Sequence, residues 1–167
     1  NLFHYAKLAA GGAVKAAEIN GFSLMRPPGH HAGRDFLGGF CYLNNMAVAV
    51  GSLDKKTIII DIDSHHGNGT EDIFRGRDDI YYISLHKNTY PGTGRKSGFN
   101  FSNYTFNGEV GDERYLEILE DKLDIKGDYK MIGISAGFDG FRGDPLASLG
   151  LTSECYYRIG EMITEIG

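Results

Sequence analysis

Short apolar runs alternate with polar, glycine-rich stretches along the chain. The central run, residues 58–60, consists of three isoleucines. A continuous run of β-branched residues is typical of a strand buried on both faces of a parallel sheet. Similar runs predict strands at residues 22–26, 57–63, 79–85 and 129–135, and a further short strand can form at residues 99–104.

Segments with helical spacing lie between these strands. Residues 112–123 carry an apolar stripe with a period of about 3.6 residues and begin with acidic side chains, which favour a helix N-terminus. Helices are also predicted at residues 2–20, 40–53, 67–74 and 151–166. Strands that alternate with helices indicate one α/β domain over residues 1–167, with a doubly wound parallel sheet.

Composition excludes some classes of function. The chain has 167 residues, enough for one domain with a sizeable core. Its net charge of -5 argues against binding nucleic acid through a basic surface. No apolar run approaches the length of a membrane span, and no signal-peptide pattern is visible. The two cysteines, Cys41 and Cys155, make no C-x-x-C motif, so we expect a protein of the reducing cytoplasm.

Polar side chains follow four of the predicted strands. Parallel sheets hold their ligands at the carboxyl ends of the strands, which meet at one edge. Four independent segments therefore send polar groups to the same edge, and these are His30, His31, Asp61, Asp63, His65, Ser84, His86 and Asp139.

The run D-x-D-x-H after the isoleucines is the clearest chemical signal. Asp61, Asp63 and His65 are spaced two residues apart, and such residues share one face of an extended chain. Two carboxylates and an imidazole at the end of a buried strand are costly to desolvate without a cation. Hydrogen bonds could satisfy them as core polar residues, and a turn could explain one aspartate. Neither accounts for the whole pattern, which favours a metal site.

A catalytic metal site has about three protein ligands and one open position. Asp63 and His65 supply two. Asp139 is the best third candidate, because it follows a glycine turn directly after a predicted strand. Asp144 competes, but it precedes proline and fits an ordinary turn. Two oxygens and one nitrogen suit zinc and leave Fe²⁺ or Co²⁺ possible.

His30 and His31 could supply an acid and a base. A single loop histidine is commonly a surface residue. Two adjacent ones, held between Pro-Pro-Gly and Ala-Gly at the edge that carries the carboxylates, favour catalysis. Each ring needs an orienting partner, and Asp61 and Asn68 are the nearest candidates.

Four stretches together resemble the zinc-dependent histone deacetylase and acetylpolyamine amidohydrolase superfamily. They read RPPGHHAGRDFLGGFCYLNN, IIIDIDSHHGNGTEDIF, ISLHKNTYPGTG and ISAGFDGFRGDPL. The resemblance covers the chain from about Leu8 to the last helix. It implies an arginase-like α/β fold, with a mainly parallel sheet between helices on both faces. It also implies metal-dependent hydrolysis of an acetylated amine, either acetyl-lysine in a protein or an acetylpolyamine, with release of acetate.

The resemblance also assigns roles to individual residues. By motif, the zinc ligands are Asp63, His65 and Asp139, and the tandem histidines are His30 and His31. Of the two, His31 resembles the general base. Asp61 matches the carboxylate that orients the first histidine, and Asn68 stands where many members have an aspartate facing the second. A neutral amide there should leave His31 less basic.

Two further sites follow only from the resemblance. Gly39, Phe40 and Tyr90 are similar to the walls of a narrow acyl channel, although core or loop packing is the alternative for Phe40 and Tyr90. A structural potassium site, built largely from backbone carbonyls, is matched by Asp61, Asp63, His65, Ser84 and Leu85.

One family element is not found in this sequence. The transition-state tyrosine of the family follows the last zinc ligand in a Gly-Gly-Tyr motif, whereas Gly38-Gly39-Phe40 is the channel motif. We therefore expect the central part of a longer enzyme, truncated at both ends and poorly active alone. A truncated or inactive member that binds metal and an acyl ligand is the alternative. An arginase-like two-manganese hydrolase is disfavoured, because it needs more bridging carboxylates. Neither the natural substrate nor the oligomeric state follows from the sequence.

Overall fold

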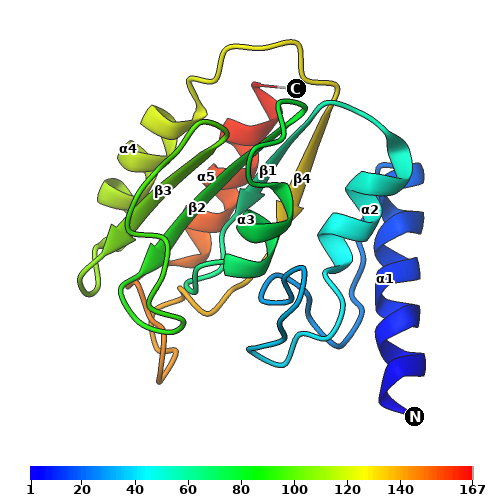
Figure 1. Ribbon diagram of the computed structural model, residues 1–167. Helices are drawn as coiled ribbons and strands as arrows, with labels where there is room; N and C mark the ends of the chain where they lie inside the picture. Colours follow the sequence, from blue (N-terminus) through cyan, green and yellow to red (C-terminus); the bar gives the residue numbers. More distant parts are fainter. Residues whose placement is uncertain (167) are drawn as a thin grey trace.

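A four-stranded parallel sheet forms the centre of the protein, in the order β3-β2-β1-β4 (Figure 1). The computed structural model describes residues 1–166. The strands are β1 (Thr57–Asp61), β2 (Ile80–Lys87), β3 (Phe101–Phe106) and β4 (Met131–Ser135). In register, Asp61 lies beside Ser84 of β2 and Ser135 of β4. The sheet confirms the predicted α/β class.

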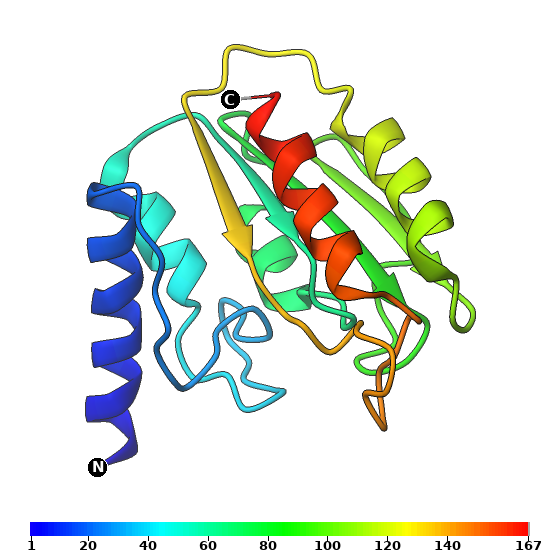
Figure 2. The same ribbon diagram turned by 180° about the vertical axis from the view of Figure 1, so that it is seen from behind.

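Helices cover both faces of the sheet (Figures 1 and 2). α4 and α5 pack on one face, α2 and α3 on the other, and α1 lies against α2. Their bounds are α1 (Leu2–Glu18), α2 (Asn45–Leu53), α3 (Asn68–Phe74), α4 (Gly111–Leu123) and α5 (Ser153–Thr164). The three-layer arrangement expected from the sequence is therefore confirmed.

The isoleucines of β1 contribute to two separate cores. Side chains alternate between the faces of a strand. Ile58 and Ile60 therefore pack with α4 and α5, whereas Ile59 packs with α2 and α3. Each is almost fully buried, which contributes about 1.5–3 kcal/mol per side chain. This central strand is a rigid support for the polar residues that follow it.

Two predicted elements differ from the structure. Residues 22–26 are not a strand, because no strand among residues 1–166 pairs with them, and Phe22 and Leu24 are 68% and 88% exposed. The helix predicted from residue 40 begins only at Asn45. Asn44 caps it by accepting a hydrogen bond from the backbone N–H of Ala47. Phe40 itself has a left-handed backbone, which excludes it from a helix.

Because all four strands are parallel, their carboxyl ends share one edge, which we call the carboxyl edge. The loops 62–67, 88–100 and 136–152 follow β1, β2 and β4 there, and the loop 29–44 lies beside them (Figure 1, lower part). The opposite edge, where the strands begin, is the amino edge. Within residues 1–166, none of the helices is both long and apolar enough to cross a membrane.

Candidate metal centre and histidine pair

Asp63, His65 and Asp139 meet at the carboxyl edge although Asp139 lies far away in the sequence. Nδ1 of His65 is 3.0 Å from Oδ1 of Asp63 and 2.7 Å from Oδ2 of Asp139. One ligand atom from each of the three lies within 4.8 Å of the others. All three side chains are partly exposed, so the group can be reached from solvent.

Backbone contacts hold these side chains in place. Oδ1 of Asp63 accepts a hydrogen bond from the backbone N–H of His65 at 2.8 Å. Oδ1 of Asp139 accepts one from Ser64 at 2.9 Å, which ties the loop after β4 to the loop after β1. The close approach requires Gly137, since a Cβ there would lie 2.1 Å from Oδ2 of Asp63.

This donor set fits one divalent cation. Two carboxylates and one imidazole, preset by backbone contacts and open to solvent, match the ligands of a catalytic zinc site. Asp144 does not join them. Its Oδ1 accepts hydrogen bonds from the backbone of Leu146 and Ala147, which is the turn role expected from the sequence.

Opposite charges stabilise the ionised forms of Asp63 and His65. Burial alone would raise the pKa of Asp63, but the hydrogen bond from His65 and the charge of His30 lower that pKa to about 2. Hydrogen bonds to Asp139 and Asp63 raise the pKa of His65 to about 10 despite burial. A cation that takes this nitrogen must displace its proton, so binding would be pH-dependent.

His30 lies next to this group and is held by Asp61. Its Nδ1 is 3.0 Å from Oδ2 of Asp61, and its Nε2 is 3.9 Å from Oδ2 of Asp63. Asp61 is fully buried, and Tyr82 donates a second hydrogen bond to the same Oδ2 at 3.0 Å. Burial lowers the pKa of His30, but the charge and hydrogen bond of Asp61 outweigh it and raise the pKa to about 9.

His31 has a different partner. Its Nδ1 lies 2.8 Å from Oδ1 of Asn68, and its ring centroid is 3.9 Å from that of His30. Burial and the charge of His30 lower the pKa of His31 to about 4. Because an amide oxygen only accepts, Nδ1 of His31 carries the hydrogen and Nε2 keeps a free lone pair. At neutral pH, a pKa of about 9 favours a protonated His30, whereas a pKa of about 4 favours a neutral His31.

The loop that carries the pair is fixed to two helices. The carbonyl of His30 accepts hydrogen bonds from Gly69 and Thr70 in the first turn of α3. Nδ2 of Asn44, the cap of α2, donates to the carbonyl of Ala32 and to Oγ1 of Thr70. The ring positions are thus set by the framework.

Sequence reasoning missed Tyr82 and Gly67. Tyr82 is two residues before Ser84 on β2 and so shares its face, which was an available signal. A Cβ at Gly67 would lie 2.2 Å from Oδ2 of Asp61 and 2.4 Å from the Tyr82 hydroxyl. Only glycine lets the loop pass so close to this carboxylate, which explains the glycine after the two histidines.

Two of the three predicted channel residues, Gly39 and Tyr90, pack against His31. A Cβ at Gly39 would lie 2.0 Å from Cδ2 of His31, so this backbone packs directly on the ring. The ring of Tyr90 meets those of His31 and His65 edge-on, at centroid distances of 5.1 and 6.3 Å. Phe40 is 84% exposed and has a φ of 65°, which is costly for a bulky residue.

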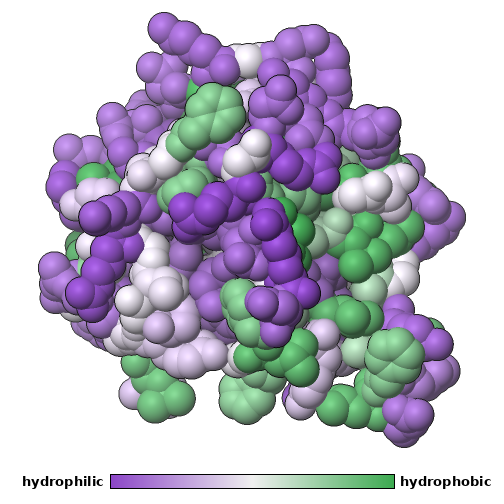
Figure 3. Space-filling view, in the orientation of Figure 1, coloured by the Kyte–Doolittle hydropathy of each residue, from purple (hydrophilic) through white to green (hydrophobic). Residues whose placement is uncertain are grey.

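Exposed apolar side chains gather at the same edge. Figure 3 shows exposed apolar side chains along the lower part of the molecule, including those over the start of α1 at the lower right, whereas the upper part is mostly hydrophilic. In the loops of the carboxyl edge they include Leu37, Phe40, Tyr90, Phe138, Phe141 and Leu146. An apolar rim around a polar centre suits a ligand that has an aliphatic chain and a polar end.

Two tyrosines follow Asp139 in the sequence, Tyr156 and Tyr157, and both lie on α5. The hydroxyl of Tyr156 is buried against Gly140, where it has no hydrogen-bond partner among residues 1–166. Its ring packs edge-on against Phe138 at 5.3 Å. Tyr157 is exposed on α5.

For the predicted potassium site, Ser84 lies beside Asp61 and its Oγ is 2.9 Å from Nδ1 of His86. Ion binding there stays a prediction.

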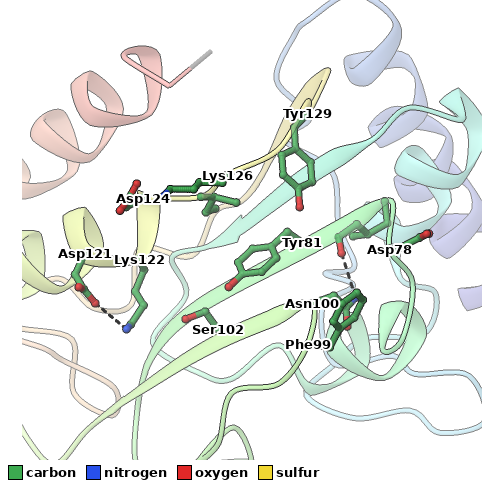
Figure 4. Close-up of a pocket in the computed structure, with 12 residues that line it drawn as sticks. Asp78, Tyr81, Phe99, Asn100, Ser102, Asp121, Lys122, Asp124, Lys126 and Tyr129 are labelled. Atoms are coloured by element: carbon green, nitrogen blue, oxygen red, sulfur yellow. Dashed lines mark hydrogen bonds and ion pairs between the residues drawn. The ribbon is translucent and has the colours of Figure 1, made fainter.

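A hollow of about 430 Å³ lies at the opposite, amino edge (Figure 4). It is bounded by the beginnings of β2 and β3 and by the segment after α4. Its labelled side chains include Tyr81, Phe99, Lys122 and Tyr129. None of the residues predicted from the sequence to form a site lies there, so the hollow is separate from the candidate centre.

Comparisons with known proteins identify the family of this chain. The family model described as "Histone deacetylase domain" matches residues 1–167. The chain is 40% identical to acetylpolyamine amidohydrolase 1 of Pseudomonas aeruginosa over 87% of its own length and 47% of that protein. It is 42% identical to histone deacetylase 15 of Arabidopsis thaliana over 88% of its own length and 30% of that protein.

A solved structure gives the same result. The crystal structure of the HDA15 HD domain superposes with a TM-score of 0.89 at 39% identity, over 97% of this chain and 54% of that one. The chain thus spans about half or less of the length of these relatives. The matched family model, the sequence identities and the shared fold show that the chain belongs to the histone deacetylase domain family.

Proposed function

We propose that the protein hydrolyses the amide bond of an acetylated amine, either acetyl-lysine in a protein or an acetylpolyamine, and releases acetate. The observation that carries the proposal is the meeting of two groups at the carboxyl edge. Asp63, His65 and Asp139 form a compact set of ligand atoms, and His31 presents a free nitrogen lone pair beside them. Relatives named as deacetylases and as acetylpolyamine amidohydrolases support the reaction class.

Asp63, His65 and Asp139 would hold the metal ion, and zinc suits their two oxygens and one nitrogen best. When bound, such an ion polarises an amide carbonyl and lowers the pKa of water. His65 would bind it through Nδ1, the atom that faces both carboxylates. Fe²⁺ and Co²⁺ can use the same donors.

His31 would act as the general base through Nε2. Its Nδ1 hydrogen is engaged by Asn68, so the ring is held in the tautomer that leaves Nε2 free. Its lowered pKa keeps it unprotonated at neutral pH. A water molecule next to this nitrogen can therefore lose a proton to it.

His30 would stay protonated and supply positive charge. The raised pKa of about 9 keeps hydrogens on both of its ring nitrogens at neutral pH. Nδ1 donates to Asp61, and Nε2 points toward the ligand Asp63 at 3.9 Å. This charge next to the reacting carbonyl favours the negative charge that develops on oxygen.

Gly39, Phe40 and Tyr90 would line the path of the acyl chain. Gly39 and Tyr90 both pack on His31, and the exposed, strained Phe40 is better explained by a ligand contact than by core packing. We also propose a structural potassium ion beside Asp61 and Ser84 and a cytoplasmic location, the latter supported by two buried free cysteines.

The test is acetate release by the full-length gene product, loaded with zinc, from an acetyl-lysine peptide and from a mono-acetylated diamine. Turnover that a chelator removes and zinc restores is expected for at least one substrate. The preferred substrate separates the two classes. Zinc-loaded protein that releases acetate from neither substrate would reject the proposal.

A further inference from the structure

A buried polar cluster beneath the Tyr90 loop is not used by the proposed chemistry. It contains His66 and His86, whose ring centroids are 4.6 Å apart, together with Glu71, Ser84 and the partly buried Thr105. Polar groups that are withdrawn from water keep fixed partners, because an unpaired one costs about 1–3 kcal/mol. The hydrogen bonds of this cluster therefore form two continuous chains, which we call its arms.

The first arm of the cluster runs from Glu71 through His66 to Thr93. Oε2 of Glu71 lies 3.0 Å from Nε2 of His66. A carboxylate only accepts, so His66 donates from Nε2. Its Nδ1 then meets Oγ1 of Thr93 at 2.8 Å. Glu71 is itself held by Asn103, at 2.6 Å, and by an ion pair with Arg75.

The second arm runs from Ser84 through His86 and Thr105 to Gly94. Thr105 donates its hydroxyl hydrogen to the carbonyl of Gly94 at 3.1 Å. Its oxygen must therefore accept from Nε2 of His86, 3.2 Å away. Nδ1 of His86 then accepts from the hydroxyl of Ser84 at 2.9 Å. Burial and the neighbouring His66 lower the pKa of His86, which agrees with a neutral ring that has one donor and one acceptor.

Both arms end on consecutive residues of the loop that carries Tyr90. The backbone of Gly94 also packs closely against the rings of His66 and His86. A Cβ at this position would lie 2.5 Å from Cε1 of His86 and 2.6 Å from Cδ2 of His66. Residues 88–99, Thr93 included, are exposed, except for the half-buried Pro91 and Gly94. The two arms thus anchor the loop at Thr93 and Gly94, whereas Asn103 holds its later part through Lys96 and Ser97.

We propose that these arms form a clamp that holds Tyr90 against His31 and His65, with His66, His86, Thr93 and Thr105 as positioning residues. None of these four touches the reacting atoms. They act through the loop, and the proposal rests on the proposed function only for the role of Tyr90 as a channel wall. Their loss should widen the channel without removing metal ligands or the base.

Fluorescence tests the clamp without any turnover. The 167-residue chain contains no tryptophan, so Tyr90→Trp makes this position the only indole. Against that background, Thr93→Val removes the hydroxyl that bonds His66 while keeping the shape, and Thr93→Ser keeps the hydroxyl. Thr89→Val is the matched control, because Thr89 is exposed on the same loop and its hydroxyl has no hydrogen bond among residues 1–166.

Thr93→Val should raise the acrylamide quenching constant by about twofold or more, whereas Thr93→Ser and Thr89→Val should leave it unchanged. Thr105→Val and Thr105→Ser repeat the test on the second arm. Circular dichroism establishes that each variant is folded. Equal quenching for the valine and serine variants at both positions would overturn the clamp, whether or not the protein is a deacetylase.

Kinetics of the full-length, zinc-loaded protein provide a second readout that does not need the tryptophan. Thr93→Val should raise KM for the acetylated substrate by about five- to tenfold, with kcat changed by less than about twofold and zinc content intact. Thr93→Ser should restore KM. A variant that only reduces the fraction of folded protein would lower kcat and leave KM unchanged, and that result would count against the clamp.

Discussion

Both edges of the sheet carry acidic and basic side chains, but these side chains differ in how far they are exposed to water. At the carboxyl edge, Asp61 and His30 are withdrawn from water and paired with each other. At the amino edge, the hollow of Figure 4 also has acidic and basic side chains, and Lys122 pairs with Asp121 at 2.8 Å. There the Asp121 side chain is 69% exposed.

The difference shows that a functional site is indicated by charged side chains that meet and are buried, more than by their charge alone. At the carboxyl edge, partners and burial place the pKa values of two adjacent histidines at about 9 and about 4. At the amino edge, the hydrogen bond from Lys122 lowers the pKa of Asp121, but water screens this exposed pair. Perturbed groups that meet in one opening are candidates for chemistry, whereas exposed pairs usually are not.

The largest difference between the two edges is expected when a proposed metal ligand is removed. Asp139→Asn should abolish stoichiometric zinc binding, since loss of a ligand should exceed the roughly 10- to 100-fold cost of losing an outer partner. The variant keeps Oδ1, which accepts from the backbone of Ser64, so the loop should stay in place. Metal analysis by mass spectrometry provides the measurement.

Asp144→Asn is the matched control for this prediction. Asp144 lies in the same loop but serves a turn, so its zinc content should equal that of the wild type. Undiminished zinc in a folded Asp139→Asn protein would show that Asp139 is not a ligand.

The next largest effect is expected at the base. In the full-length protein, His31→Ala should lower kcat by about 10²- to 10⁴-fold while zinc remains bound. His4→Ala serves as the control, because His4 lies exposed on α1. Near-native turnover by His31→Ala would place the general base elsewhere.

A smaller effect tests why the two histidines differ. Asn68→Asp should raise the pKa of His31, by about 1–3 units for an adjacent carboxylate. A base works only when unprotonated, so activity is lost as the pH falls through its pKa. The acidic limb of the kcat/KM profile should therefore move to higher pH in the variant. An unchanged limb would show that His31 does not set it.

Most of this arrangement could be predicted from the sequence, because local patterns determine it. The isoleucines of β1 indicated the strand, and the D-x-D-x-H run indicated the polar groups that follow it. The strand ends at Asp61 and not at the predicted Asp63, so Asp63 and His65 lie in the following loop. The meeting with Asp139 followed from the rule that parallel strands share a carboxyl edge. The structure brings these residues together as expected.

Other contacts between distant segments could not be predicted from the sequence. Residues 22–26 have the apolar pattern of a strand, but a strand forms only beside a partner. The bond from Tyr82 to Asp61 and the link from Glu71 to His66 depend on which side chains meet in three dimensions. Nor does the sequence reveal that Thr93 and Gly94 rest on two buried rings.

The smallest effect is expected at the amino edge, where Lys122→Gln removes one charge from the hollow. Its partner Asp121 is exposed, so the pair contributes little, and Tm should shift by less than about 2 °C. Zinc content and KM should remain unchanged, because no proposed site residue lies there. Leu119→Ala, on the buried side of α4, should instead lower the free energy of unfolding by about 2–5 kcal/mol. A Lys122→Gln protein with normal Tm but altered zinc content or KM would show that the two edges are coupled, and the contrast between them would then be wrong.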